Sequence, residues 1–132
     1  MQHIAIIGFG CAGYHALAAI REEGCDAEID VYSDTDMPPY NPMLTTYYAA
    51  GKLSYEGLFP FGDLEEISKR YHARFYTKVR VISVKAKEKI VVTSDGKEKN
   101  YDKILISTGA FAFVPGSFAE LKEAHCMRTV ED

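Results

Sequence analysis

The sequence predicts an α/β fold built on a parallel sheet, and three observations carry that prediction. Continuous apolar runs at residues 3–7 and 103–107 are typical of strands that are buried on both faces of a parallel sheet. A helical pattern over residues 12–23 leads from the first run to an alternating, β-branched segment at residues 28–32. Before the last run, short strand-like segments predict an inserted three-stranded antiparallel meander at residues 79–85, 89–93 and 97–101.

The middle of the chain predicts less regular structure. Pro38, Pro39 and Pro42 interrupt the segment over residues 33–62, where we expect only a short helix over residues 44–50. Asp63 can cap a second helix, which we expect to end near His72. Beyond residues 115–116, we expect only a short polar tail with some helical character.

Size and composition narrow the class of protein. The 132 residues, of which 47% are hydrophobic, are enough for one folded domain or part of one. A net charge of -4 gives no positive field for polyphosphate chains, so we expect no nucleic acid partner. Residues 1–20 are uncharged, but glycines interrupt them and no basic residue precedes the apolar run. We therefore expect neither a signal peptide nor a membrane segment.

The cysteines bear on compartment and metal binding. Cys11, Cys25 and Cys126 are odd in number and lack the CxxC spacing of zinc and dithiol sites. The histidines are not spaced as metal ligands either. We therefore expect free thiols, a reducing cytoplasmic location and no metal site.

A glycine motif lies between the first strand and the first helix. Residues 8–13 read GFGCAG, which matches GxGxxG in the position that dinucleotide binding requires. In such a motif the first glycine makes the turn, the second lets a diphosphate approach the backbone, and the third lets helix and strand pack closely. The helix N-terminus supplies free N–H groups for the phosphates. The motif favours a Rossmann-type parallel sheet that binds a dinucleotide over a glycine turn with only a structural role.

An acidic residue is expected about 20 residues after this motif, where a carboxylate can bind ribose hydroxyls. Asp34 is the first candidate because it follows the second strand, and Asp36 is the next. Asp30 lies within the strand, too early for this role. The alternative for each is a solvated loop carboxylate that binds nothing.

Four segments form a more specific pattern. They are residues 8–13 (GFGCAG), 39–52 (PYNPMLTTYYAAGK), 81–84 (VISV) and 101–110 (YDKILISTGA). In this pattern the chain resembles the N-terminal FAD-binding segment of the pyridine nucleotide-disulfide oxidoreductases, especially the branch of NADH oxidases, ferredoxin and rubredoxin reductases and the flavin part of nitrite reductases. The last segment is the most specific, because it matches the family's YDxLxxATG strand, with Ser107 in place of the usual alanine.

The resemblance implies cofactor contacts along the chain. The glycine motif would line the FAD diphosphate, Asp34 or a neighbour would hold the adenosine ribose, and the backbone of Val81 would contact adenine. The segment after the last strand would approach the cofactor from the other side, and Pro42 with Met43 would lie near the flavin. The implied cofactor-binding residues are Gly8, Gly10, Cys11, Ala12, Gly13, Asp34, Pro42, Met43, Val81, Thr108 and Gly109. The resemblance assigns no catalytic residue.

The chain departs from this family in two ways: in the polar residues that would hold FAD, here called the polar clamp, and in the absence of a redox cysteine after the second strand. Many relatives carry Glu near Thr35 and Arg where this chain has Pro42, so the polar clamp on FAD is weakened or supplied differently. Residues 33–69 contain no cysteine, so thiol chemistry from this segment is excluded unless Cys11 takes part.

The resemblance also implies a domain division and a function. Residues 1–110 would be the N-terminal portion of an FAD-binding domain, and residues 111–132 a linker toward an NAD(P)H-binding domain. The full-length enzyme would pass electrons from NAD(P)H through FAD to a small-molecule or redox-protein acceptor, and a homodimer is one expected assembly. The chain alone would be inactive. Two alternatives stay open: a single-domain NAD-binding regulator, and a structural half-domain without activity.

Overall fold

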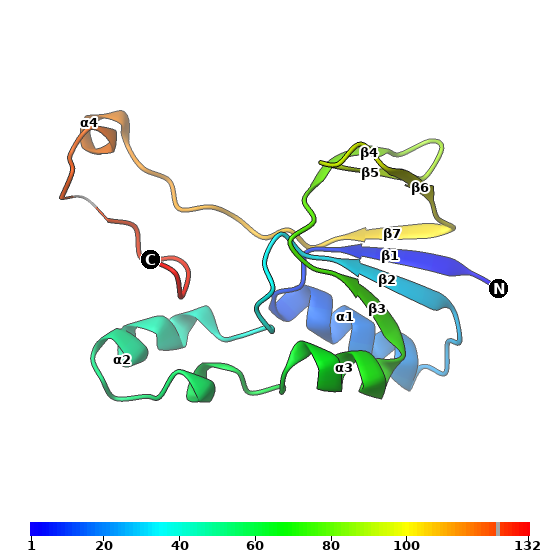
Figure 1. Cartoon of the computed structure of the whole chain (residues 1–132), viewed down its shortest axis with the longest axis horizontal. Coiled ribbons are helices and arrows are strands. Elements are labelled where there is room, and N and C mark those ends of the chain that lie inside the picture. Colours follow the sequence, from blue (N-terminus) through cyan, green and yellow to red (C-terminus); the bar gives the residue numbers. More distant parts are fainter. Residues whose placement is uncertain (124) are drawn as a thin grey trace.

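A computed structural model describes residues 1–123 and 125–132, and its centre is a parallel sheet (Figure 1). The four strands are ordered β3-β2-β1-β7, and all neighbouring pairs are parallel. Their bounds are His3–Ile7 for β1, Glu28–Tyr32 for β2, Ala73–Tyr76 for β3 and Lys103–Ile106 for β7. The predicted central position of the first apolar run is confirmed, because β1 pairs with β2 on one side and with β7 on the other.

The predicted meander is also present. It forms a separate antiparallel sheet of order β4-β5-β6, with β4 at Val81–Lys85, β5 at Ile90–Thr93 and β6 at Glu98–Asn100. In Figure 1 this sheet covers one face of the parallel sheet, and the long helices cover the other. The α/β architecture predicted from the sequence is therefore correct.

Two helices connect the parallel strands. Helix α1, Cys11–Glu22, follows the glycine motif, and the chain turns out of it at Gly24 with φ +73°. Helix α3, Leu64–Tyr71, begins with a capping box in which Asp63 accepts from the Glu66 backbone N–H and the Glu66 side chain accepts from the Asp63 backbone N–H. These caps place both helices within two residues of the predicted bounds.

The segment between β2 and α3 extends away from the sheet. It contains the short helical turns η1, Pro42–Leu44, and η2, Glu56–Leu58, on either side of α2, Thr45–Ala49. The C-terminal tail carries α4, Gly116–Ala119, and returns toward this excursion. The Val130 backbone N–H donates to the Tyr40 hydroxyl at 3.2 Å there.

Strand β3 was not expected from the sequence. Its four residues follow α3 with only His72 between them, and His72 makes the reversal in the left-handed region at φ 47°. A strand this short, at the edge of a sheet and joined to a helix without a loop, lacks the flanking turn residues that mark strands. In the structure Ala73 is buried and Arg74 is exposed, an alternation too short to mark a strand in the sequence.

Buried apolar residues form two clusters, one on each face of the parallel sheet. The cluster against the helices contains Ile4, Ile6, Phe9, Tyr14, Leu17, Ala27, Ile29, Val31, Ile67 and Ala73. The cluster under the meander is smaller and contains Ala5, Ile7, Tyr32, Val91 and Tyr101. Alternate residues of β1 enter opposite clusters, which explains why that strand is apolar throughout.

Candidate functional site

The glycine turn lies at the carboxyl end of β1, between β2 and β7. Gly8 has φ +91°, and its backbone N–H donates to the Tyr32 carbonyl at 2.8 Å. A Cβ at this position would collide with the carbonyl oxygen of Ser107. Only glycine fits here, because the backbone is left-handed and the next segment passes directly over it.

The other two glycines of the motif have different surroundings. A Cβ on Gly13 would collide with the Gly8 carbonyl oxygen, so this glycine allows α1 to pack against the turn. Gly10 precedes the first residue of α1, and, in residues 1–123 and 125–132, no atom beyond its immediate chain neighbours lies within 4 Å of where its Cβ would be. Space is therefore open over Gly10, where the first N–H groups of a helix lack partners within the helix. A diphosphate could approach the backbone at this point.

A pocket opens beside this turn at the carboxyl edge of the sheet. It has a volume of about 170 Å³ and is lined by Ile7, Gly8, Tyr32, Asp34, Val79, Arg80, Val81, Thr108 and Phe111. We call it the Asp34 pocket. Its wall comes from the ends of β1, β2 and β7 and from the segment that enters β4. In open parallel sheets this edge is where ligands bind.

The pocket brings together four of the residues that the sequence predicts as cofactor contacts. Gly8, Asp34, Val81 and Thr108 come from four segments that are far apart in the chain. Gly109 follows directly, with φ +70°.

Other predicted contacts lie outside the pocket. Cys11 and Ala12 are exposed in the first turn of α1, beside the open space over Gly10. Pro42 and Met43 lie in η1, and Met43 is 78% exposed. The structure does not bring these last two to the pocket.

The structure separates the acidic candidates. The carboxylate of Asp36 pairs with the Lys78 ammonium at 2.6 Å, and this hydrogen bond lowers the pKa of Asp36. Asp30 is buried within β2. Asp34 is exposed and lines the pocket, so it is the carboxylate that is placed to meet a ligand.

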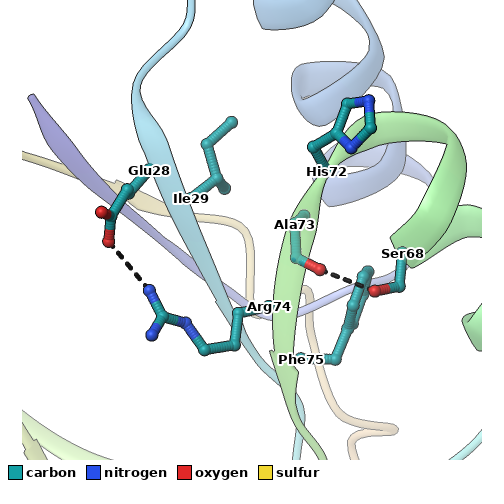
Figure 2. A pocket seen from close by; sticks show the side chains of 7 residues that line it. All are labelled: Glu28, Ile29, Ser68, His72, Ala73, Arg74 and Phe75. Carbon is teal, nitrogen blue, oxygen red and sulfur yellow. Dashed lines mark hydrogen bonds and ion pairs between the residues drawn. The ribbon is translucent and has the colours of Figure 1, made fainter. Parts of the chain in front are cut away.

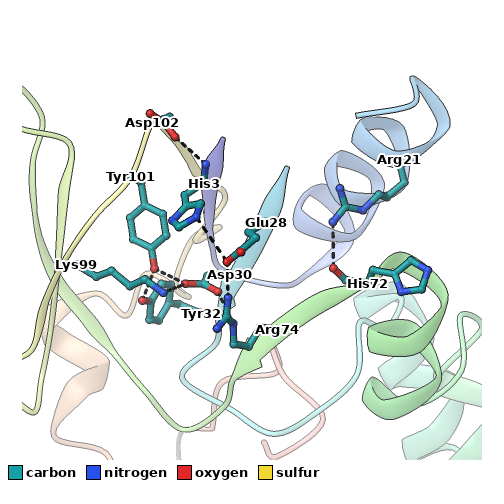
Figure 3. A network of polar contacts seen from close by, with 10 residues as sticks. All are labelled: His3, Arg21, Glu28, Asp30, Tyr32, His72, Arg74, Lys99, Tyr101 and Asp102. Carbon is teal, nitrogen blue, oxygen red and sulfur yellow. Dashed lines mark hydrogen bonds and ion pairs between the residues drawn. The ribbon is translucent and has the colours of Figure 1, made fainter. Parts of the chain in front are cut away.

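A polar network that sequence reasoning missed surrounds Asp30 (Figure 3). Its carboxylate, 3% exposed, accepts from Lys99 Nζ at 2.6 Å, the Tyr101 hydroxyl at 2.7 Å and Arg74 Nε at 3.0 Å. The Tyr32 and Tyr101 hydroxyls lie 2.6 Å apart. We call these five residues the Asp30 network. They join β2 and β3 to β6 of the meander and so hold the meander over the parallel sheet.

Burial and hydrogen bonding shift the ionisation of this network. Burial, with hydrogen bonds to Tyr32 and Asp30, raises the pKa of Tyr101 far above its usual range. The hydrogen bond to Asp30 raises the pKa of Lys99. At neutral pH the lysine is therefore charged and the tyrosine protonated. The one sequence signal for this network was the acidic residue inside a strand with basic residues inside β3 and β6.

The Ser107 side chain also contacts the glycine turn. Its hydroxyl donates to the Gly8 carbonyl oxygen at 2.8 Å and lies 3.2 Å from the Ile7 carbonyl oxygen. An alanine, the usual residue at this place in the family that the sequence resembles, has no hydroxyl to make these contacts. Ser107 thus adds side-chain hydrogen bonds to the glycine turn.

A larger hollow of about 410 Å³ lies at the other edge of the sheet (Figure 2). It is an open depression beside α3, β3 and the start of β2. Within it, the Ser68 hydroxyl donates to the Ala73 carbonyl at 2.8 Å, and Arg74 pairs with Glu28 at 2.9 Å. Its polar groups thus bond to one another. None of the predicted cofactor contacts lines it.

Comparison with known proteins now assigns the family. The profile of the pyridine nucleotide-disulphide oxidoreductases matches residues 2–132. The chain belongs to this family. Among curated relatives, it is 30% identical over 137 residues to an NADH oxidase of Methanocaldococcus jannaschii, covering 96% of this chain and 30% of that protein. It is 24% identical over 136 residues to a putidaredoxin reductase of Pseudomonas putida, covering 99% of this chain and 32% of that protein.

Solved structures agree with this family. The water-forming NADH oxidase from Lactobacillus brevis, solved bound to NADH, matches 87% of this chain and 26% of its own, with a TM-score of 0.79 at 26% identity. The sulfide:quinone oxidoreductase from Aquifex aeolicus matches 99% of this chain and 29% of its own, with a TM-score of 0.82. At 23% identity, that second likeness shows the fold alone.

The chain spans about a third of the length of these curated relatives. In the part of it that the structure describes, every helix is too short or too polar to cross a membrane. The described cysteines, Cys11, Cys25 and Cys126, are all free.

Proposed function

We propose that this chain is the FAD-binding part of an NAD(P)H-dependent flavoprotein oxidoreductase. The observation that carries the proposal is the carboxyl edge of the parallel sheet, where the glycine turn, Asp34, Val81 and Thr108 meet in a chain of this family. When bound, FAD supplies the redox chemistry, which is the acceptance of hydride from a nicotinamide and the onward release of electrons.

The residues present fit a dinucleotide. Open space over Gly10 admits a diphosphate to the N-terminus of α1, and a Cβ there would occupy that space. Asp34 would accept hydrogen bonds from the adenosine ribose, and the backbone of Val81 would contact adenine. Thr108 and Gly109 would approach the cofactor from β7.

Pro42 and Met43 are the proposed contacts with the flavin end of the cofactor. They lie in η1, outside the pocket, and would come near the flavin only if the cofactor extends from the glycine turn toward the excursion. The division into an FAD-binding portion over residues 1–110 and a linker over 111–132 is likewise part of the proposal. It is supported by the way the tail leaves the sheet after β7 (Figure 1).

The activity of a longer protein is proposed from its relatives. Relatives named as an NADH oxidase and as putidaredoxin and rubredoxin reductases favour NAD(P)H as the donor and a small molecule or a redox protein as the acceptor. The free thiols favour a reducing, cytoplasmic compartment. A homodimer stays a prediction, which sedimentation of the purified protein can test.

The decisive test compares two glycine substitutions. Gly10 has an ordinary φ of -83° and open space at its Cβ, so Gly10→Ala should fold like the original chain. Gly116 also has open space at its Cβ and lies far from the turn, so Gly116→Ala is the matched control. After incubation with FAD and desalting, we expect flavin absorbance to stay with the original chain and the control, and to fall at least about tenfold with Gly10→Ala, because the added methyl blocks the diphosphate.

Other outcomes favour the alternatives. A chain that takes up NAD but no FAD would favour a nucleotide-binding regulator. A chain that binds neither cofactor would favour a structural half-domain. Equal flavin retention by the Gly10 and Gly116 variants would show that the diphosphate does not bind at the glycine turn.

A further inference from the structure

We propose that Arg80 binds a phosphate group of the dinucleotide in the Asp34 pocket. This inference rests on the proposed function and adds a contact that the glycine motif did not reveal. Nine residues line the pocket, and Asp34 and Arg80 are the two that carry a charge. They have opposite charges, so the pocket offers an acceptor for hydroxyl groups and a cation for an anionic group.

Neighbouring charges are already paired, whereas these two are not. Lys78 pairs with Asp36 at 2.6 Å, and Lys97 pairs with Asp95 at 2.7 Å. Within residues 1–123 and 125–132, neither Arg80 nor Asp34 takes part in an ion pair. The guanidinium of Arg80 is therefore available to a ligand.

The backbone around Arg80 is fixed from both sides. Its carbonyl oxygen accepts from the Ser94 backbone N–H at 2.8 Å, which ties it to the meander. The preceding Val79 backbone N–H donates to the Ser33 carbonyl at 3.0 Å, which ties the segment to the end of β2. The position of the side chain's base is thus set before any ligand binds, and less entropy is lost on binding.

A diphosphate is negatively charged, and the glycine turn alone balances little of that charge. Residues 1–20 contain no Lys or Arg, so the glycine turn offers a diphosphate only backbone N–H groups and about half a positive charge from the helix dipole. Gly8 and Arg80 line the same pocket, so a ligand that reaches from Asp34 to the turn passes beside Arg80. An arginine matches the geometry of phosphate oxygens, with which it can form two parallel hydrogen bonds.

Two small probes separate a phosphate contact from other roles. ADP carries the diphosphate and adenosine does not, so their affinities for one variant can be compared by calorimetry. With Arg80→Gln we expect ADP to bind about tenfold more weakly while adenosine binding changes less than about twofold. Arg80→Lys should keep most of the ADP affinity, because the charge remains. Lys87→Gln removes an exposed cation in the turn between β4 and β5 and should leave both affinities unchanged.

Several results would overturn the inference. If Arg80→Gln binds ADP as tightly as the original chain and also retains FAD, the arginine plays no part in phosphate binding and the proposed function stands. If the variant loses ADP and adenosine in equal measure while its circular dichroism is unchanged, Arg80 contacts the adenine or ribose and not the phosphate. A chain that binds neither ADP nor FAD would overturn both this inference and the proposed function.

Discussion

The two faces of the parallel sheet are held in different ways. On the helix face, α1 and α3 pack through a large apolar cluster that includes Leu17 and Ile67, both fully buried. On the meander face the apolar cluster is smaller, and the buried carboxylate of Asp30 binds two cations and a tyrosine. Packing between apolar side chains involves no titrating group and is not screened by salt, whereas a charged network depends on pH and on screening.

This difference bears on the candidate site. The meander carries Val81, and the segment that enters it carries Arg80, so one wall of the Asp34 pocket is positioned by charges. The opposite wall comes from the parallel strands themselves. We expect changes that weaken the Asp30 network to alter the pocket, while changes on the helix face alter overall stability.

The largest effects on the free energy of unfolding are expected from two separate substitutions, one at the centre of each face. Leu17→Ala should lower the free energy of unfolding by about 3 kcal/mol, because it leaves a cavity on the helix face. Asp30→Asn should lower it by about 2 kcal/mol, because Lys99 loses its carboxylate partner and Arg74 keeps only Glu28, while both side chains are partly exposed and can still reach water. Urea unfolding measures both values. Hydrogen exchange should show faster opening confined to β4, β5 and β6 in the Asp30 variant, and equal protection of the meander in both variants would contradict the comparison.

Alkaline pH should act on the meander face. The native pKa of Tyr101 lies above the tyrosine reference value of 10.0, so only the unfolded chain loses this proton at moderately high pH. Lys99, also raised, contributes stability below its usual pKa that is lost as pH rises through the native value. We expect stability to be level up to about pH 9 and to fall from about pH 10 upward.

The matching variant for this effect is Tyr101→Phe, which removes the ionising hydroxyl. It should be less stable at neutral pH by about 1 kcal/mol, because the hydrogen bond to Asp30 is gone, and its stability should fall less steeply above pH 10. Thermal unfolding across this pH range gives both quantities. An unchanged slope would mean that Tyr101 does not govern the alkaline limit.

The smallest effect is expected at Ser107. Ser107→Ala removes the hydrogen bonds to the Gly8 and Ile7 carbonyls and should cost at most about 1 kcal/mol. Because the turn loses a restraint without losing its shape, FAD should dissociate a few-fold faster, which stopped-flow measurement of flavin fluorescence can follow. Ser107→Thr, which keeps the hydroxyl, should restore the slower rate. Identical rates for all three proteins would show that the glycines alone set the turn.

The sequence predicted the elements whose signals are local. The strand of residues 3–7 has an unbroken apolar run, the helix after it begins at a glycine motif, and the capping box of α3 begins at Asp63. For the carboxylate that binds ribose, the sequence leaves Asp34 and Asp36 as candidates. Only the structure shows that Asp36 is bound to Lys78. That pairing depends on a segment 42 residues away, so no local pattern carries it.

The features that sequence reasoning missed all depend on contacts between distant segments. Strand β3 exists because the edge of β2 accepts it, and its own four residues are too few for a pattern. The Asp30 network and the place of Arg80 require the meander to fold back over the sheet. Asp30 lies too early in the chain for ribose binding, and its place inside a strand gives no sign of which basic residues it binds. A buried carboxylate requires a charged or hydrogen-bonding partner, and the structure shows that Lys99 and Arg74 are the basic ones.

The order of strands has a consequence for how the chain folds. Strand β1 is synthesised first and takes β7 as one of its neighbours. The two strands are separated by most of the chain, as the hydrogen bond between the His3 backbone N–H and Asp102, 99 residues apart, shows. Closing so long a loop is slow, because the entropy is lost before any contact forms. During synthesis β1 can pair with β2 early, but its other edge stays unpaired until residues 103–106 emerge. The glycine turn, to which the Ser107 hydroxyl donates, is therefore among the last parts of the molecule to gain all its contacts.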